Sequence, residues 1–582
     1  MSGIRPLPAL VVLALAALLV AVPALGLPAF YVSFLYVACN WVSLATSWAM
    51  LSGYAGYWSF GHAAFFGVGV YAAGTLAAKL GVPFLLTIPA AAALSALLGA
   101  AVGFVVFRVK RLRGELFALM TISVTAVVAT IISNTPIDGG SGVYLIGVAL
   151  PELFGSQNGT IYLLGLGMAV IAMASSYAVA HSRLGLGLFA IHDDEDVAEV
   201  KGVPTFRYKL AAFALSAAIA GAVGAVYSIY VSYVTVSETF EITVTMYPVV
   251  MTILGGARNW AGPALGAVIV TSALYGLASG PQAYLGRGAI AIGLVLVILL
   301  LPQGVLTSIV NLWHRRHPRR IVVPSRVAPA IATPPRSGPA AVALDCRGVT
   351  KAFGGIQALK GVTLAVNAGE ILGLVGPNGS GKSTLINVIT GHYPIDRGSI
   401  AFEGARIDAL PAHRVAALGI ARSYQIPRPF NHLSVLDNVA LAARFGTAHQ
   451  PGGEAAAEAM HWLDYTGLAA KAADLPQQLN LHERKFLELA RALAARPRLL
   501  LLDEVMSGLN PGEIDAALRL VRDIRDGGTT IVFVEHLMRA VVALSDRVAV
   551  LNEGALIALG TPQETMRDAE VVSVYLGKAH VA

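Results

Sequence analysis

Long apolar runs, separated by short polar stretches, occupy the first half of the chain. Each run holds about twenty residues, which is the length that a helix needs to cross a bilayer. The seven clearest runs are Leu7–Leu27, Tyr31–Leu51, Phe60–Leu80, Pro83–Phe107, Glu115–Asn134, Thr160–His181 and Lys209–Tyr233. This pattern predicts a multi-span α-helical membrane domain.

The apolar stretch from Thr243 to Leu306 is harder to divide, because glycine and proline residues interrupt it. If the positively charged loops lie inside, the stretch crosses an odd number of times. Three crossings fit best, near Met246–Gly256, Ala261–Ala278 and Ala289–Leu306. The total is then about ten spans. The first crossing is short, so a re-entrant half-helix that lines a protein-enclosed cavity remains an alternative.

The second half follows another pattern, in which charges are spread throughout and short apolar strands alternate with helices. A stretch rich in proline and arginine precedes it, which is typical of an extended tether. The predicted organisation is a transmembrane domain at 1–310, a linker at 311–343 and a soluble α/β domain at 344–582.

Charge refines this division. The chain has a net charge of +7, but its basic residues gather at the ends of apolar runs, as cytoplasmic loops do. They form no basic face interleaved with aromatic residues, so we expect no nucleic-acid binding. The soluble domain is therefore expected on the cytoplasmic side of the membrane. The two cysteines, Cys39 and Cys346, lie in different domains and predict neither a disulfide nor a metal site.

The soluble domain contains a phosphate-binding pattern. An apolar strand, Glu370–Val375, runs directly into a glycine-rich loop and then an apolar helix, which is the context that a P-loop requires. Lys382 is suited to reach the β- and γ-phosphates of ATP, and Ser383 to hold Mg²⁺. The candidate nucleotide-binding residues of this loop are Gly376, Pro377, Asn378, Gly379, Ser380, Gly381, Lys382, Ser383 and Thr384.

Two further apolar strands end in polar residues. Leu499–Leu502 leads to Asp503, which is suited to the Mg²⁺ shell, and to Glu504, which is suited to polarising the attacking water. Thr530–Val534 leads to Glu535 and His536, and His536 is a candidate sensor of the γ-phosphate. Polar residues at successive strand ends predict the carboxyl edge of a parallel sheet.

These residues give the soluble domain a resemblance to the nucleotide-binding domain of ABC transporters, a P-loop α/β fold. The resemblance implies that Phe353 stacks on adenine. It also implies that Gln425 takes part in catalysis and in holding the metal, and that Ser507–Asn510 forms the D-loop. Within that family the domain is most similar to the ATPases of branched-chain amino-acid importers, on Lys351–Gly355 and on Val574–Gly577.

The membrane domain independently resembles the permeases of the same importers. The stretches that carry this resemblance are Ser59–Gly67, Leu112–Ala118, Ser182–Gly202, Tyr208–Leu210 and Met251–Gly256. Within the third of them, Asp193–Gly202 is a short polar segment with helical character, closed by Gly202 and Pro204. The resemblance implies that it is the coupling helix that docks into a groove on the ATPase; an ordinary exposed loop is the alternative.

One stretch departs from the family pattern. The signature loop has a serine followed by glycines in the family, whereas this chain reads Leu479–Glu483, ahead of a helix predicted at Arg484–Ala495. The resemblance implies that this loop caps the nucleotide of a second ATPase. Asn480 can still offer an amide donor there, but Leu481 and His482 carry side chains where close backbone approach favours glycine.

Together, these resemblances imply ATP-driven import of a branched-chain or related small amino acid. They also imply an external solute-binding protein and a second permease and ATPase, in a homodimer or a heterodimer. An importer of urea, an amide, an aromatic acid or another compact solute is the alternative, and an exporter fits less well. A membrane-anchored ATPase without a transport role needs only one or two spans, not about ten.

Overall fold

The computed structural model describes residues 17–109, 112–152, 156–277, 288, 292–293, 295–297, 299–316, 342–447 and 449–576. These residues form two compact units. The first contains residues 17–192 and 206–316, and the second contains Asp193–Thr205 and 342–576. A short piece of chain between two helices of the first unit therefore packs with the second, and we call Asp193–Thr205 the docking segment.

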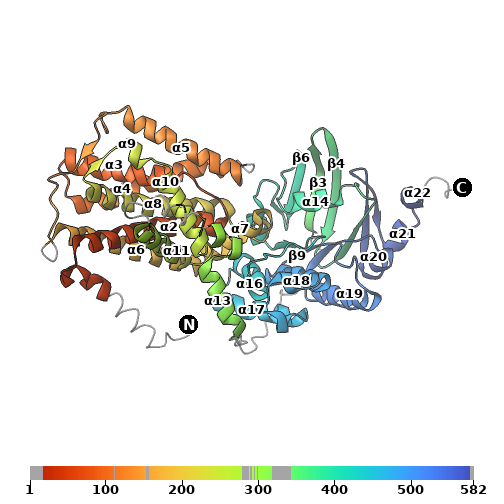
Figure 1. Cartoon of the computed structure of the whole chain (residues 1–582). Helices are drawn as coiled ribbons and strands as arrows, with labels where there is room; N and C mark the ends of the chain where they lie inside the picture. Colours follow the sequence, from red (N-terminus) through yellow and green to blue (C-terminus); the bar gives the residue numbers. More distant parts are fainter. Residues whose placement is uncertain are drawn as a thin grey trace. The chain divides into compact units, whose positions relative to one another are not determined.

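The first unit is a helical bundle with a two-stranded ribbon (Figure 1). Its helices are η1 (Val22–Leu25), α2 (Ala29–Ala55), α3 (His62–Gly74), η2 (Thr75–Lys79), α4 (Phe84–Val106), α5 (Glu115–Ser133), α6 (Gln157–Ala180), α8 (Thr205–Val231), α9 (Val236–Thr239), α10 (Thr243–Gly255), α11 (Gly262–Leu277) and α13 (Val305–Arg316). The ribbon pairs β1 (Val143–Tyr144) with β2 (Tyr233–Val234) in antiparallel orientation.

Five of the described helices, α2, α4, α5, α6 and α8, are long and apolar enough to span a membrane. They fall on five of the predicted runs. The run at Phe60–Leu80 forms α3 and η2, and the interrupted stretch forms the shorter helices α10 and α11. Parts of the predicted spans at Leu7–Leu27 and Ala289–Leu306 lie outside the described residues. The structure thus gives a helical membrane domain with about five candidate spans.

Burial in this unit is inverted relative to a water-soluble protein. Large apolar side chains are exposed on α4 and α5, including Leu97 and Leu119, while polar side chains such as Ser47 and His62 are buried. The Nε2 atom of His62 lies 3.0 Å from the Oγ atom of Ser47. Apolar surface outside and hydrogen-bonded polar groups inside is the arrangement that a lipid environment favours.

The second unit is built on two sheets. The larger has the order β12-β11-β5-β10-β9-β8, and all neighbours are parallel except β12 with β11. The smaller is antiparallel, with the order β4-β3-β6-β7. The strands are β3 (Val342–Phe353), β4 (Ile356–Asn367), β5 (Ile371–Val375), β6 (Arg397–Phe402), β7 (Ala405–Arg406), β8 (Ile420–Arg422), β9 (Leu499–Asp503), β10 (Thr530–Val534), β11 (Arg547–Asn552) and β12 (Ala555–Gly560).

Helices cover these sheets, as β5, β9 and β10 require because each is buried along its whole length. The helices are α14 (Lys382–Ile389), α15 (Ala412–Ala417), α16 (Val435–Phe445), α17 (Gly452–Tyr465), η4 (Ala469–Lys471), η5 (Pro476–Gln478), α18 (Leu481–Ala494), α19 (Pro511–Asp526), α20 (Met538–Leu544), α21 (Pro562–Thr565) and α22 (Ala569–Leu576). One more helix, α7 (Arg183–Val200), begins in the first unit and ends in the docking segment.

Regular structure enters the predicted linker range of 311–343 at both ends. Helix α13 continues to Arg316, because Leu312 and Trp313 extend the apolar helical pattern that starts at Val305. Strand β3 already begins at Val342. The stretch 317–341, which holds most of the predicted tether, lies outside the described residues.

Candidate functional site: the nucleotide edge and the docking surface

The three strands that were expected to end in polar residues are neighbours in the larger sheet. Strand β10 pairs in parallel with β5 on one side and with β9 on the other. The P-loop, which follows β5, therefore meets Glu504 and His536 at one carboxyl edge of the sheet. The predicted parallel edge is confirmed, and we call it the nucleotide edge.

The loop between β5 and α14 has the backbone of a phosphate cradle. Gly376 has φ +149°, and a Cβ atom on it would overlap the carbonyl oxygen of Leu551, so only glycine fits. The Nζ atom of Lys382, at the start of α14, donates to the carbonyl oxygens of Gly376 and Pro377 at 2.8 and 3.0 Å. Its amine thus lies inside the loop that leads to the helix N-terminus, where anions bind favourably.

Two carboxylates face this cradle. Burial raises the pKa of Asp503, the last residue of β9, although Arg422 acts in the opposite direction. The pKa of Lys382 is lowered by burial, although the nearby charges of Glu504 and Asp503 act in the opposite direction. The Asp503 carboxyl group and the Lys382 amine are both partly buried. Such groups are suited to bind a ligand that carries anionic groups together with a cation.

Glu504 is held by its backbone and by its side chain. Its φ of +48° is uncommon for a residue other than glycine, and its N–H donates to the carbonyl oxygen of Val534 at 2.9 Å. The Nε2 atom of Gln425 donates to its Oε2 atom at 2.7 Å. The Nδ1 atom of His536 lies 3.9 Å from the same oxygen. The structure thus brings together all three predicted catalytic residues.

The residues present fit ATP and a divalent cation. Ser380 is buried in the P-loop, and its Oγ atom has no hydrogen-bond partner among the residues that the structure describes. A buried orphaned hydroxyl is costly unless a ligand satisfies it. Ser383 is exposed beside it at the start of α14. The hydroxyl of Ser383, the amide of Gln425 and the carboxylate of Asp503 are oxygen donors of the kind that Mg²⁺ prefers.

Two predicted nucleotide-binding residues lie apart from this cluster. Phe353, at the end of β3, is 41% exposed, and its ring packs edge-on against Tyr393 at 5.2 Å, with the Nζ atom of Lys351 5.4 Å from the ring centroid. Asn480 precedes α18, and its Oδ1 atom accepts from the N–H of Glu483 at 2.9 Å. Its amide NH₂ remains suited to the donor role that the resemblance implies.

The helix predicted at Arg484–Ala495 starts three residues earlier than expected. Helix α18 begins at Leu481, because Asn480 and Glu483 cap each other's backbone N–H groups. Leu481 and His482 are therefore in the first helical turn and not in a loop. The Asn-x-x-Glu spacing in the sequence signals this start, and Asn510 and Glu513 repeat it at the start of α19.

The sequence prediction also missed residues that support the catalytic candidates. The Oγ atom of Ser423 accepts from the N–H of Asp503 at 3.0 Å. The Nζ atom of Lys485 donates to the carbonyl oxygens of Glu504 and Val505 at 3.4 Å, and to that of Ser507. A signal was available for α18: Lys485, Glu488 and Arg491 recur every three residues on a face that is otherwise apolar.

The docking segment starts with a bend in α7. Asp194 has extended backbone angles of φ −160° and ψ 102°, and its Oδ1 atom accepts from the N–H of Val197 at 3.0 Å. This contact caps a new short helix. The helix ends at Gly202, which has φ +96° and no room for a Cβ atom against the carbonyl oxygen of Phe445. The segment is thus a compact helical stub, as its sequence suggested.

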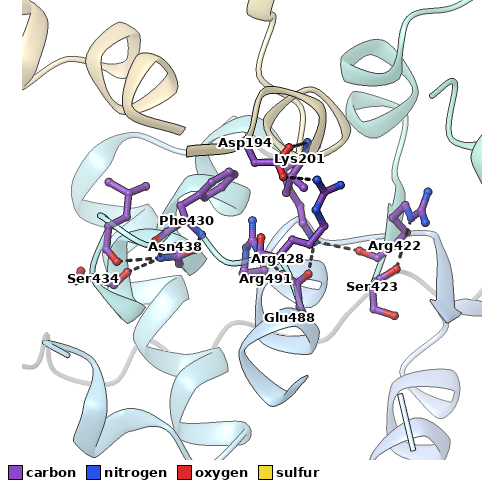
Figure 2. A network of polar contacts seen from close by, with 12 residues as sticks. Asp194, Lys201, Arg422, Ser423, Arg428, Phe430, Ser434, Asn438, Glu488 and Arg491 are labelled. Carbon is purple, nitrogen blue, oxygen red and sulfur yellow. Dashed lines mark hydrogen bonds and ion pairs between the residues drawn. The ribbon is translucent and has the colours of Figure 1, made fainter. Parts of the chain in front are cut away.

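Charged contacts hold this stub within the second unit. Asp193 binds the backbone N–H and the ring of His432. Asp194 pairs with Arg428 at 2.7 Å (Figure 2). Lys201 donates to the carbonyl oxygen of Arg422 at 3.0 Å and pairs with Glu488 at 3.3 Å. We call the receiving residues Arg422, Arg428, His432, Phe445 and Glu488 the docking surface.

Comparisons with known proteins agree with this geometry. The model of the family described as "Branched-chain amino acid transport system / permease component" matches residues 30–302, and that of the ABC transporter family matches 359–507. The high-affinity branched-chain amino acid transport ATP-binding protein BraF of Pseudomonas aeruginosa is 35% identical over 250 residues, which are 40% of this chain and 98% of BraF. LivG of Salmonella typhimurium is 34% identical over the same shares.

A third relative, the lipopolysaccharide export system ATP-binding protein LptB of Escherichia coli, is 36% identical over 237 residues, covering 40% of this chain and 97% of LptB. All three relatives match the ATPase half. Because the chain spans nearly their whole length, it belongs to the ABC transporter family, with a branched-chain-type permease domain and an ABC ATPase domain in one polypeptide. Its activity is ATP hydrolysis coupled to transport.

Proposed function

We propose that this chain is the permease–ATPase subunit of a bacterial importer that moves branched-chain or related small amino acids into the cytoplasm. The observation that carries the proposal is the agreement of the two halves. The permease family model covers 30–302, while BraF and LivG resemble the ATPase half. LptB resembles the same half and serves a different solute, so the permease half supplies the argument about the solute.

In this proposal the nucleotide edge performs the hydrolysis. Lys382 and the N-terminus of α14 hold the β- and γ-phosphates, and the exposed ring of Phe353 stacks on the base. Ser383, Gln425 and Asp503 hold Mg²⁺, which when bound neutralises charge on the phosphate oxygens. The carboxylate of Glu504 accepts the proton of the attacking water, and Gln425 orients that carboxylate through its hydrogen bond. His536 senses the γ-phosphate.

The proposal also covers the assembly. Two ATPase domains pair so that Asn480 of one chain faces the nucleotide of its partner, and an external binding protein delivers the solute. About ten spans cross the inner membrane, with the ATPase domain in the cytoplasm. The partner is a second copy of this chain or a different permease and ATPase. Purification of a transport-competent assembly that contains only this chain would establish the homodimer.

Uptake into proteoliposomes tests the solute. The complex and its binding protein are reconstituted with ATP inside, and radiolabelled leucine is supplied outside. We expect ATP-dependent leucine accumulation that unlabelled isoleucine or valine suppresses and urea does not. Suppression by urea or acetamide, with no effect of the branched-chain amino acids, would favour the alternative of a compact amide solute.

Cysteine labelling with a membrane-impermeant reagent tests the orientation. Ser141 lies exposed after α5, and Arg108 lies exposed after α4. We expect Ser141→Cys to react from outside intact cells and Arg108→Cys to react only after permeabilisation. The reverse labelling pattern would invert the proposed topology.

A further inference from the structure

The docking surface contains a cluster of fully buried charges. The side chains of Lys201 and Glu488 are 4% and 2% exposed, and that of Arg491 is 0% exposed. Glu488 lies between the two cations and pairs with both. In the described part of the chain, the docking segment has three further ion pairs, with His413, His432 and Arg428, whose side chains are 23%, 54% and 48% exposed. Removing one member of the buried cluster is costlier than removing one of these more exposed partners.

Lys201 reaches the nucleotide edge by one route through β8. Its Nζ atom bonds the carbonyl oxygen of Arg422, the last residue of that strand. The next residue, Ser423, donates its N–H to the carbonyl oxygen of Leu501 and accepts from the N–H of Asp503 at 3.0 Å. Two covalently adjacent residues thus connect the ammonium group of Lys201 to the end of β9, which carries Glu504.

A second route passes through α18. Glu488 lies one turn after Lys485 on this helix, and Lys485 bonds the carbonyl oxygens of Glu504, Val505 and Ser507. Both routes therefore converge on the segment Asp503–Ser507. Figure 2 shows Lys201 at the point where they diverge, between Arg422 and Glu488.

The burial of these charges favours a single geometry for the connection. Burial lowers the pKa of Lys201 to about 8, even though Glu488 acts to raise it. Burial alone would raise the pKa of Glu488, but Arg491 and Lys201 outweigh burial and lower it. If the docking segment moved without α18, Lys201 and Glu488 would each lose a partner in a site without water. Separating them is therefore costly, and the segment, α18 and the end of β8 should move together.

We infer that Lys201 is a positioning residue for ATP hydrolysis. It holds the docking segment, α18 and β8 together as one unit. The docking segment therefore moves together with Asp503–Ser507, the segment that contains Glu504. Lys201 does not touch the nucleotide in this role. The inference rests on hydrolysis coupled to transport and is independent of which solute is carried.

The test uses the full-length complex in lipid nanodiscs, with ATP as the only probe. Amide hydrogen exchange is followed across the docking segment before and after ATP is added, in the wild type, Lys201→Met and Lys201→Arg. We expect the ATP-induced change in exchange to fall about fivefold in Lys201→Met and to return in Lys201→Arg. In steady-state assays we expect kcat to fall about fivefold in Lys201→Met while the KM for ATP stays the same.

Arg347→Met is the matched control, since it removes the 75% exposed cation of an ion pair with Asp345 outside the docking surface, and we expect a wild-type response. A wild-type exchange response in Lys201→Met would overturn the inference, as would a wild-type complex in which ATP leaves the docking segment unchanged. If Lys201→Met does not assemble, Lys201→Gln retains a donor for Arg422 and gives the same test. If neither Lys201→Met nor Lys201→Gln assembles, Lys201 is required for folding and the inference is overturned. Leucine uptake plays no part in these measurements, so they stand apart from the proposed solute.

Discussion

The nucleotide edge and the docking surface are both polar regions of the ATPase unit, yet their polar groups are used differently. At the docking surface the buried charges of Lys201 and Glu488 pair with each other, although two nitrogen atoms of the neighbouring Arg491 have no hydrogen-bond partner among the described residues. At the nucleotide edge Ser380 has a buried hydroxyl without a partner in the described part of the chain, and burial raises the pKa of Asp503.

This difference separates a region built to receive a ligand from a region built to hold a piece of its own chain. Unsatisfied buried groups cost stability and are retained where a ligand completes them. Satisfied buried charges contribute little net stability, but removing one member exposes the full cost of the others. Substitutions at the docking surface should therefore affect stability most, and those at the nucleotide edge should affect catalysis.

The largest expected effect is on stability at the docking surface. Glu488→Ala leaves Lys201 and Arg491 buried without an anion, and should lower the free energy of unfolding by about 3–5 kcal/mol. The measurement is denaturant unfolding of the ATPase unit within the full-length chain, followed by fluorescence. The control is Arg428→Ala, which removes the half-exposed partner of Asp194 but leaves the Asp194 helix cap in place, and should cost below about 1 kcal/mol. Equal costs for the two variants would remove the contrast between buried and exposed pairs.

At the nucleotide edge the expected effect is on rate. Glu504→Gln keeps the hydrogen-bonding shape but cannot accept a proton, so kcat for ATP should fall about a hundredfold or more. The affinity for ATP, measured with a fluorescent analogue, should stay within about twofold because Lys382 and the P-loop are unchanged. Glu553→Gln removes an 83% exposed carboxylate and serves as the control. Near-normal turnover of Glu504→Gln would exclude this residue as the base.

A smaller effect is expected at the end of the docking segment. Gly202→Ala combines a positive φ with a clash against the carbonyl oxygen of Phe445, so it should destabilise the unit by about 1–3 kcal/mol. Gly467→Ala is the matched control, because Gly467 has φ +75° but open space around its Cβ position. It should show only the backbone cost, about 1 kcal/mol. Identical unfolding midpoints for both variants would mean that the contact with Phe445 adjusts freely.

The smallest effect concerns the start of α18. Asn480→Ala removes the cap of this helix and should cost about 1 kcal/mol of stability, whereas Asn480→Ser should cost only a few tenths. Thermal unfolding of both variants gives the comparison. A larger loss of ATPase activity than of stability in Asn480→Ala, reversed in Asn480→Ser, would point to a second role at a partner's nucleotide.

The sequence predicted much of the nucleotide edge, because its signals are local. The strand and P-loop around Lys382, and the apolar strands that end at Asp503 and Val534, have short patterns with one physical interpretation. Their adjacency in a parallel sheet followed from the rule that such ends share an edge, and β5, β10 and β9 confirm it.

Contacts between distant parts of the chain could not be predicted in the same way. The pairing of Lys201 with Glu488 joins residues 287 positions apart, and no local sequence pattern predicts that either side chain is buried. The sequence indicated a short helical segment at Asp193–Gly202, but not the bend at Asp194 or the cap that its carboxylate forms on Val197. The count of about ten spans stays a prediction. Five described helices are long and apolar enough to cross a membrane, and hydropathy does not assign short helices such as α10 to full crossings.

The separation of Lys201 from Glu488 along the chain has a consequence for biosynthesis. During translation the docking segment leaves the ribosome long before α18 is made. Lys201 is therefore synthesised well before Glu488, its acidic partner. The ATPase domain therefore matures against a template that the nascent chain already presents. An ATPase fragment expressed from residue 342 onward would lack that template and leave Glu488 without Lys201. Such a fragment should depend more on chaperones, and adding a peptide of residues 193–205 in trans should improve its yield.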